Sequence, residues 1–195
     1  MMSKNRIEAF SDGVIAIIIT VMVFDLKIPD LAAHFTDADV WNAFRALMPK
    51  IGAYALSYVV LAIMWLNHHA LFDQLPHTTS KLVWYNSFLL FAMSLIPAPT
   101  AFLAVHPFLP QAVMFYGFIM FMNGLGFYLL RWYVEAKAQL LPYNPFIQRS
   151  NRITSLLYLA SVPLAWVSVY LSFIIFIGIP IWYFLPDKFH ASKSS

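Results

Sequence analysis

The chain has 195 residues, of which 61% are hydrophobic and 11% are charged, and its mean hydropathy is +0.70. Soluble domains carry about 25% charged residues, so this composition excludes an ordinary soluble protein and predicts an integral membrane protein. The net charge of +3 is small and the basic residues lie in short groups between apolar runs, which argues against nucleic-acid binding. The absence of cysteine excludes disulfides and thiolate metal sites.

Six transmembrane helices are predicted, because crossing ~30 Å of hydrocarbon takes roughly 20 mostly apolar residues in a helix. The first four are expected over residues 6–26, 51–72, 81–105 and 111–133. The apolar stretch from 153 to 185 is expected to form a hairpin of two helices that turns near residues 166–168. We therefore expect one all-α membrane domain over 1–195, with residues 186–195 as a cytoplasmic tail.

A short interfacial helix is expected between the first two spans, over about residues 36–48. This stretch alternates apolar and polar residues at helical spacing, and Thr36 is suited to cap its start. Pro49 is suited to the first turn of the following helix. In the third span, Pro97 and Pro99 should bend or break the outer end, because each lacks a backbone donor.

The distribution of Lys and Arg predicts the orientation, because these residues favour cytoplasmic loops. With six crossings, most of them fall on the side that holds both termini. These are Lys4, Arg6, Lys81, Arg131, Lys137, Arg149, Arg152, Lys188 and Lys193. The opposite side receives Lys27, Arg45 and Lys50 together with several acidic residues. Both termini are therefore expected in the cytoplasm.

Polar side chains gather at the predicted cytoplasmic ends of the first three spans. They are Arg6, Ser11, Asp12, Trp65, Asn67, His68, His69 and Asn86. Ionisable groups next to hydrocarbon normally pair with one another, although Asp12 and Arg6 placed simply among lipid headgroups is an open alternative. Adjacent histidines point about 100° apart on a helix, so no metal site is expected at His68 and His69. No nucleophile accompanies the carboxylates, so we expect no catalytic residues and no enzyme activity.

Two motifs in this region carry a family resemblance. The sequence R-I-E-A-F-S-D-G over 6–13 opens the first helix, and W-L-N-H-H-A-L-F over 65–72 ends the second. Together with Asn86 and the P-A-P-T turn over 97–100, they resemble bacterial relatives of the endolysosomal potassium channel called transmembrane protein 175. The likeness covers nearly the whole chain and is strongest through about residue 100.

The resemblance implies a potassium-selective cation channel that lacks the T-V-G-Y-G filter of ordinary potassium channels, and this sequence has no such segment. It implies a homotetramer of six-helix subunits around a central pore in the bacterial plasma membrane. The expected partners are further copies of the chain, the bilayer and permeant K⁺, with no cofactor. A secondary transporter remains an alternative, although it would need a polar midplane site. A proton-permeable cation channel is a second alternative.

Carrying the family pattern over the first helix assigns the pore-lining positions. They are Ile17, Val21 and Phe24, with Thr20 on an adjoining face. Four Ile17 side chains are expected to form a hydrophobic constriction that gates by excluding water, and Phe24 should narrow the outer pore. A second apolar stripe of comparable spacing consists of Ile15, Ile19 and Met22, and periodicity does not choose between the two.

The polar cluster at the cytoplasmic ends of the first three helices is expected to hold these helices together. Ser11 and Asp12 are expected to bond across to Trp65, to His68 or His69, and to Asn86, which would tie the pore helix to the next two helices. Arg6 would neutralise carboxylate charge nearby. In a second interpretation, Asp12 attracts cations to the pore mouth.

Overall fold

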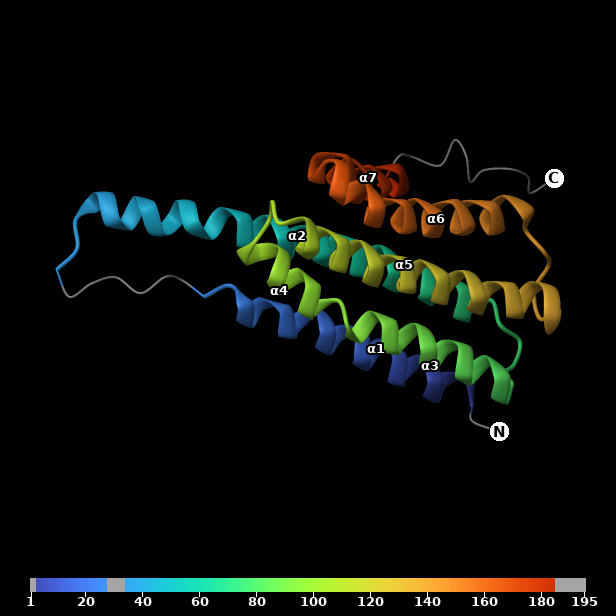
Figure 1. The fold of residues 1–195 in the computed structure, drawn as a ribbon. Helices are drawn as coiled ribbons and strands as arrows, with labels where there is room; N and C mark the ends of the chain where they lie inside the picture. The colour runs from blue at the N-terminus through green and yellow to red at the C-terminus, as the bar shows by residue number, and fades with distance from the viewer. Residues whose placement is uncertain (1–2, 28–33, 185–195) are drawn as a thin grey trace.

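The computed structural model describes residues 3–27 and 34–184, and all of its regular structure in those ranges is helical. Figure 1 shows the helices as an elongated bundle with α1 and α3 on one side and α6 and α7 on the other. The helices are α1 (Lys4–Val21), η1 (Met22–Asp25), α2 (Asp37–Asp73), α3 (Ser80–Ser94), α4 (Pro97–Val105), α5 (Pro110–Trp132), η2 (Tyr133–Lys137), α6 (Pro145–Val167) and α7 (Val169–Phe184). The expected tail over 186–195 lies outside the described residues.

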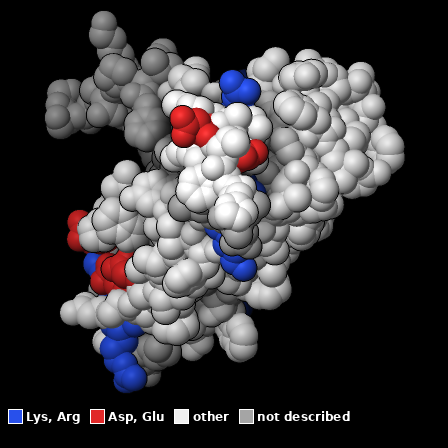
Figure 2. Space-filling model, turned by 90° about the vertical axis from the view of Figure 1, so that its left-hand side faces the viewer, with Lys and Arg blue, Asp and Glu red and all other residues white. Residues whose placement is uncertain are grey.

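Four helical stretches of the described chain are long and apolar enough to cross a membrane. They are Lys4–Asp25, Asp37–Asp73, Ser80–Val105 and Pro110–Lys137. The 23-residue α6 and the shorter, apolar 16-residue α7 follow them. Figure 2 views the molecule from the side on which α2 begins and shows charged side chains only in small, separate groups. The all-α membrane fold expected from the sequence is confirmed.

The expected interfacial helix and second span are one continuous helix, α2. Thr36 caps its start, as predicted, and exchanges hydrogen bonds with Asp39 in a capping box. Pro49 lies inside α2 and not at the start of a separate helix. A proline in a helix removes one hydrogen bond, and here the helix continues through it. The first half of α2 extends beyond the rest of the bundle (Figure 1).

The third span is broken into α3 and α4, as the prolines predict. At the break, the backbone hydrogen bonds join residues three apart, where an α-helix joins residues four apart. They run from Leu95 N to the Ala92 carbonyl (3.3 Å) and from Ile96 N to the Met93 carbonyl (3.0 Å). A side chain of α5 also supports the break, because Asn123 Nδ2 donates to the Ala92 carbonyl at 3.0 Å. The bend is therefore held by a neighbouring helix as well as by the prolines.

Small residues let α5 and α6 approach closely. A Cβ atom added at Gly117 would lie 2.3 Å from Ser161 Oγ, and one added at Gly124 would lie 3.2 Å from the Ser155 backbone. Such small-residue contacts are a common basis of helix association in membranes. Two glycines thus set the distance between these helices.

The last two helices form the expected hairpin. Ser168 separates them with an extended backbone, and Ser172 Oγ donates to the Ser161 carbonyl across the turn at 2.7 Å. The start of α6 differs from the expected position, because α6 begins at Pro145 and not near residue 153. Asn144 caps that start by accepting from the backbone of the next turn, and a proline in the first position favours a helix.

Candidate pore helix and its polar anchor

One face of α1 and η1 is exposed along its whole length. The residues on this face are Phe10, Gly13, Ile17, Thr20, Val21 and Phe24. Residues 10, 13, 17, 20 and 24 follow one another at intervals of three and four, and Val21 lies four residues after Ile17, which places all six along a single stripe. Ile17 is 62% exposed and Phe24 is 73% exposed, so this apolar stripe makes little contact with the rest of the chain.

The rival stripe of α1 is mostly packed inside the subunit. Ile15 is 1% exposed, Met22 is buried beside it on the same side of the helix, and Ile19 is half-buried. α1 contacts α2 and α3, while η1 contacts α4. Of the two stripes that periodicity left open, the one containing Ile17 is the one left free for contacts outside the subunit.

Thr20 adds a polar group to the exposed face. Its hydroxyl donates back to the carbonyls of Ala16 and Ile17, at 3.0 Å in both cases. The proton is therefore used within the helix, and the lone pairs of the oxygen are directed away from it. Beyond Val21 the helix tightens into η1, which carries Phe24 at the end of the exposed face.

A buried chain of hydrogen bonds joins α1, α3 and α2. Asn86 Nδ2 donates to Ser11 Oγ at 2.9 Å, and the Ser11 hydroxyl donates to the Ile7 carbonyl at 2.8 Å. His68 Nε2 lies 2.7 Å from Asn86 Oδ1, and because that oxygen only accepts, the histidine nitrogen donates. Ser11, Asn86 and His68 are each at most 2% exposed, so the chain is closed to solvent.

A second, more exposed contact joins α1 and α2. Trp65 Nε1 donates to Asp12 Oδ1 at 2.9 Å, and the His69 ring stacks on Trp65 with centroids 5.9 Å apart. The two histidines thus have separate partners: His68 hydrogen-bonds to Asn86, and His69 stacks on the indole. Asp12 and Asn86 belong to different parts of the expected cluster.

Arg6 is exposed at the start of α1 and forms no ion pair with a described carboxylate. Lys4, which the sequence analysis did not place in the polar cluster, donates from Nζ to the carbonyl of Asp73 at the end of α2, at 2.8 Å. A cation beside helix C-terminal carbonyls is favourable. The start of α1 is therefore held to α2 at three levels, by Lys4, by the buried chain and by Asp12.

Sequence reasoning also missed a buried group of three hydroxyls. Ser57 Oγ lies 2.8 Å from Thr100 Oγ1 and 3.1 Å from Tyr116 Oη, which joins α2, α4 and α5. Thr100 donates its own proton to the Ile96 carbonyl, so the order of donation runs from Tyr116 to Ser57 to Thr100. Polar residues in apolar spans were the available signal, since they need partners there.

No group of three or more His, Cys, Asp or Glu side chains that could hold a metal ion is found within residues 3–27 and 34–184.

Comparisons with known proteins agree on one family. The model of the family described as "Endosomal/lysosomal potassium channel TMEM175" matches residues 6–97. A potassium channel of Streptomyces collinus is 33% identical over 180 residues, which are 86% of this chain and 85% of that protein. A potassium channel of a Chryseobacterium species is 36% identical over 129 residues, which are 66% of this chain and 64% of that protein.

The fold also matches a solved structure. The crystal structure of a lysosomal potassium-selective channel TMEM175 homolog from Chamaesiphon minutus superposes with a TM-score of 0.78 at 30% identity. The match covers 92% of this chain and 95% of that one.

Proposed function

The chain belongs to the TMEM175 family of potassium channels, and on this premise we propose that four copies of it form a potassium-selective channel with α1 lining the pore. The observation that supports this most is the exposed apolar stripe from Phe10 to Phe24 on a helix whose opposite face is packed. In the proposed assembly that stripe faces a central axis. A single subunit cannot enclose a pore with one helix, so closed symmetry is required.

In the proposed pore, Ile17 forms the constriction. An apolar ring offers a cation no oxygen in place of its hydration shell, so the ring closes the pore by excluding water. Ion discrimination then depends on the size of the ring and on the lower cost of removing water from K⁺ than from Na⁺. The Thr20 oxygens, one turn along the exposed face, supply acceptors next to the constriction. Val21 and Phe24 line the continuation of the pore beyond the constriction, where the large Phe24 ring narrows its outer part.

The polar contacts at the start of α1 are proposed to anchor this helix. Ser11 connects through Asn86 to His68, and Asp12 connects directly to Trp65. Motion that opens the Ile17 ring would then take place beyond these contacts, toward η1. The anchor would keep the four helices in register while the constriction changes width.

The proposed location is the bacterial plasma membrane, with both termini in the cytoplasm. The bacterial sources of the matched potassium channels support the membrane. The concentration of Lys and Arg on the side of the termini supports the orientation.

Recording from the purified protein in planar bilayers tests the function. With K⁺ on one side and Na⁺ on the other, a potassium-selective channel gives discrete current steps and a reversal potential far from zero, toward the K⁺ equilibrium value. Discrete steps also separate a channel from a secondary transporter, which turns over too slowly to give them. Absence of steps from reconstituted tetramers would contradict the proposal.

A further inference from the structure

The short helix α4 supports the end of the proposed pore helix. It has nine residues and lies between the break after α3 and the turn before α5. η1 contacts both α4 and α2 (Figure 1), and Met22 of η1 is 2% exposed. α1 passes into η1 without interruption, so a displacement of η1 is transmitted to Ile17. The position of α4 therefore bears on the position of the proposed constriction.

One polar side chain connects α4 to the rest of the bundle. Thr100 is the only residue of α4 with a polar side chain, and it is 4% exposed. Its Oγ1 lies 2.8 Å from Ser57 Oγ on α2. The other residues of α4 are proline, alanine, phenylalanine, leucine and valine, whose side chains pack but form no hydrogen bonds. Thr100 is thus the one α4 residue whose side chain can fix the helix by a directional contact.

The hydrogen bonds of Thr100 belong to a chain that runs in one direction, from α5 through α2 to the break. Tyr116 donates to Ser57 at 3.1 Å, and Ser57 donates to Thr100. Thr100 in turn donates to the Ile96 carbonyl at 2.7 Å. Ser57 and Tyr116 are fully buried, so no water replaces a partner that is lost. We call the side chains of Ser57, Thr100 and Tyr116 the hydroxyl chain.

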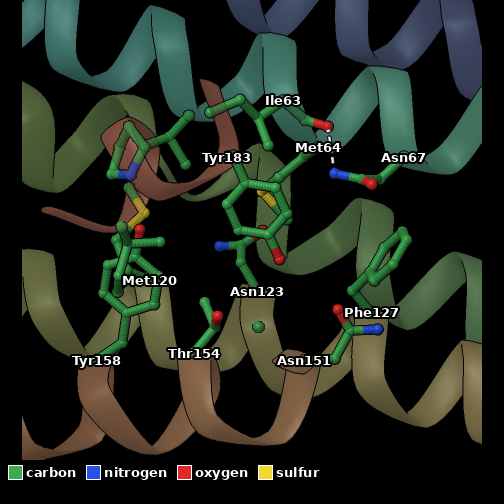
Figure 3. Close-up of a pocket in the computed structure, with 14 residues that line it drawn as sticks. Ile63, Met64, Asn67, Met120, Asn123, Phe127, Asn151, Thr154, Tyr158 and Tyr183 are labelled. Atoms are coloured by element: carbon green, nitrogen blue, oxygen red, sulfur yellow. Dashed lines mark hydrogen bonds between the residues drawn. The ribbon is translucent and has the colours of Figure 1, made fainter. Parts of the chain in front are cut away.

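Asn123 of α5 holds the α3 side of the same break. Its Nδ2 donates to the Ala92 carbonyl at 3.0 Å and to the carbonyl of Ile119, in its own helix, at 2.8 Å. Figure 3 shows Asn123 among the residues that line a small cavity of about 60 Å³ between α2, α5, α6 and α7. α5 therefore fixes the α3 side of the break through Asn123, whereas the α4 side depends on the hydroxyl chain.

We propose that Ser57, Thr100 and Tyr116 are positioning residues of the channel gate. The hydroxyl chain holds α4 against α2, and these two helices together support η1. With η1 supported, the outer half of α1 stays close enough to its copies for the Ile17 side chains to close the pore. The three hydroxyls do not touch permeant ions, because all of them are buried inside the subunit. The inference rests on the proposed function, since it assigns a support to the gate proposed there.

Single-channel recording of the purified full-length protein in planar bilayers tests this role, with Thr100→Val and Tyr116→Phe as variants. Each substitution removes a hydroxyl and keeps the shape of the side chain. We expect the ratio of open to closed time to rise roughly fivefold in each variant, the effect of losing about one neutral hydrogen bond. The single-channel current and the reversal potential should keep the parental values, because the pore lining is unchanged. An unchanged or lower ratio in both variants would overturn the inference.

Tyr133→Phe is the matched control. Tyr133 Oη lies 2.8 Å from Thr79 Oγ1, so this substitution also removes a bond between two hydroxyls, but beyond the other end of α5. We expect a lower thermal midpoint with an unchanged ratio of open to closed time. A rise equal to that of Tyr116→Phe would attribute the effect to a general loss of stability and refute the role. Thr100→Ser keeps the hydroxyl and should gate as the parent protein does.

The double variant Ser57→Ala/Thr100→Val shows whether the hydroxyl chain acts as one unit. If it does, the double variant should raise the ratio no more than the larger of the two single substitutions. Fully additive effects would show that the two residues act separately and would overturn the chain. A parent protein without potassium-selective current steps would refute the proposed function itself. Normal parental steps with unchanged gating in the variants would refute this inference alone.

Discussion

His68 donates a hydrogen bond to Asn86, 18 residues along the chain, at 2.7 Å, and Asn86 in turn donates to Ser11. A single amide therefore connects the proposed pore helix to both of its neighbours. Both polar atoms of the Asn86 amide are hydrogen-bonded: Oδ1 accepts from His68 on α2, and Nδ2 donates to Ser11 on α1. This residue is the centre of the proposed anchor.

Replacing Asn86 by leucine should destabilise the subunit. The substitution leaves the His68 N–H without an acceptor in a closed environment, which costs about 1–3 kcal/mol. A lower midpoint in thermal unfolding of the detergent-purified protein, followed by size-exclusion chromatography, would show the effect. Asn42→Leu, exposed on α2, serves as the control and should melt as the parent does. An Asn86→Leu protein that melts like the parent would show that the buried chain does not anchor α1.

Substitutions of Asp12 can distinguish the role of its hydrogen bond to Trp65 from the role of its negative charge. Asp12→Asn keeps an oxygen that can accept from Trp65, so we expect normal assembly and unchanged conductance, whereas Asp12→Leu should lower stability. The measurements are the melting midpoint and the single-channel conductance at low and high salt. A normal melting midpoint for Asp12→Asn with conductance reduced only at low salt would assign Asp12 to cation attraction at the pore mouth.

Gly117→Ala should loosen the packing of α5 on α6. The added methyl group would lie 2.3 Å from Ser161 Oγ, so either the Ser161 hydroxyl must give up its bond to the Tyr158 carbonyl or the two helices must move apart. Overpacking of this kind costs about 1–3 kcal/mol. The thermal midpoint should fall, and the double variant with Ser161→Ala should recover part of it.

Gly178→Ala is the control for this pair, because a Cβ there meets nothing within 4 Å. It should be neutral or slightly stabilising, since alanine favours a helix more than glycine does. A fall in the midpoint equal to that of Gly117→Ala would attribute both effects to glycine replacement in general.

The proposed assembly makes a separate prediction. Native mass spectrometry of the detergent-solubilised protein should show four chains, because a ring of α1 helices needs several copies to surround a pore. Monomers or dimers that conduct after reconstitution would disprove the assembly.

Features that depend on local chemistry could be predicted from the sequence. Apolar runs of sufficient length gave the helices, the prolines at 97 and 99 gave the break between α3 and α4, and the capping side chain of Thr36 gave the start of α2. The continuity of α2 through Pro49 was not predicted. A proline can start a helix or be tolerated inside one, and the residues around Pro49 do not distinguish the two cases.

Features that depend on helix rotation and on distant partners needed the structure. Periodicity offered two stripes on α1, and only the packing of Ile15 and Met22 shows which one is free. The different partners of His68 and His69 follow from the positions of α3 and α1, which the spacing on α2 does not contain. The small cavity that Asn123 lines among α2, α5, α6 and α7 likewise depends on how four helices pack together.

Ile17 is proposed to form the hydrophobic constriction of a potassium-selective pore. The most direct test is the reversal potential of Ile17→Asn with K⁺ and Na⁺ on opposite sides of the bilayer. A polar ring admits water and lowers the barrier for every cation, so the current should rise while the reversal potential moves toward zero. Ile15→Asn buries an unpaired amide at a cost of about 1–3 kcal/mol and should reduce stability without a leaky pore. An unchanged reversal potential in Ile17→Asn, together with its collapse in Ile15→Asn, would contradict the account.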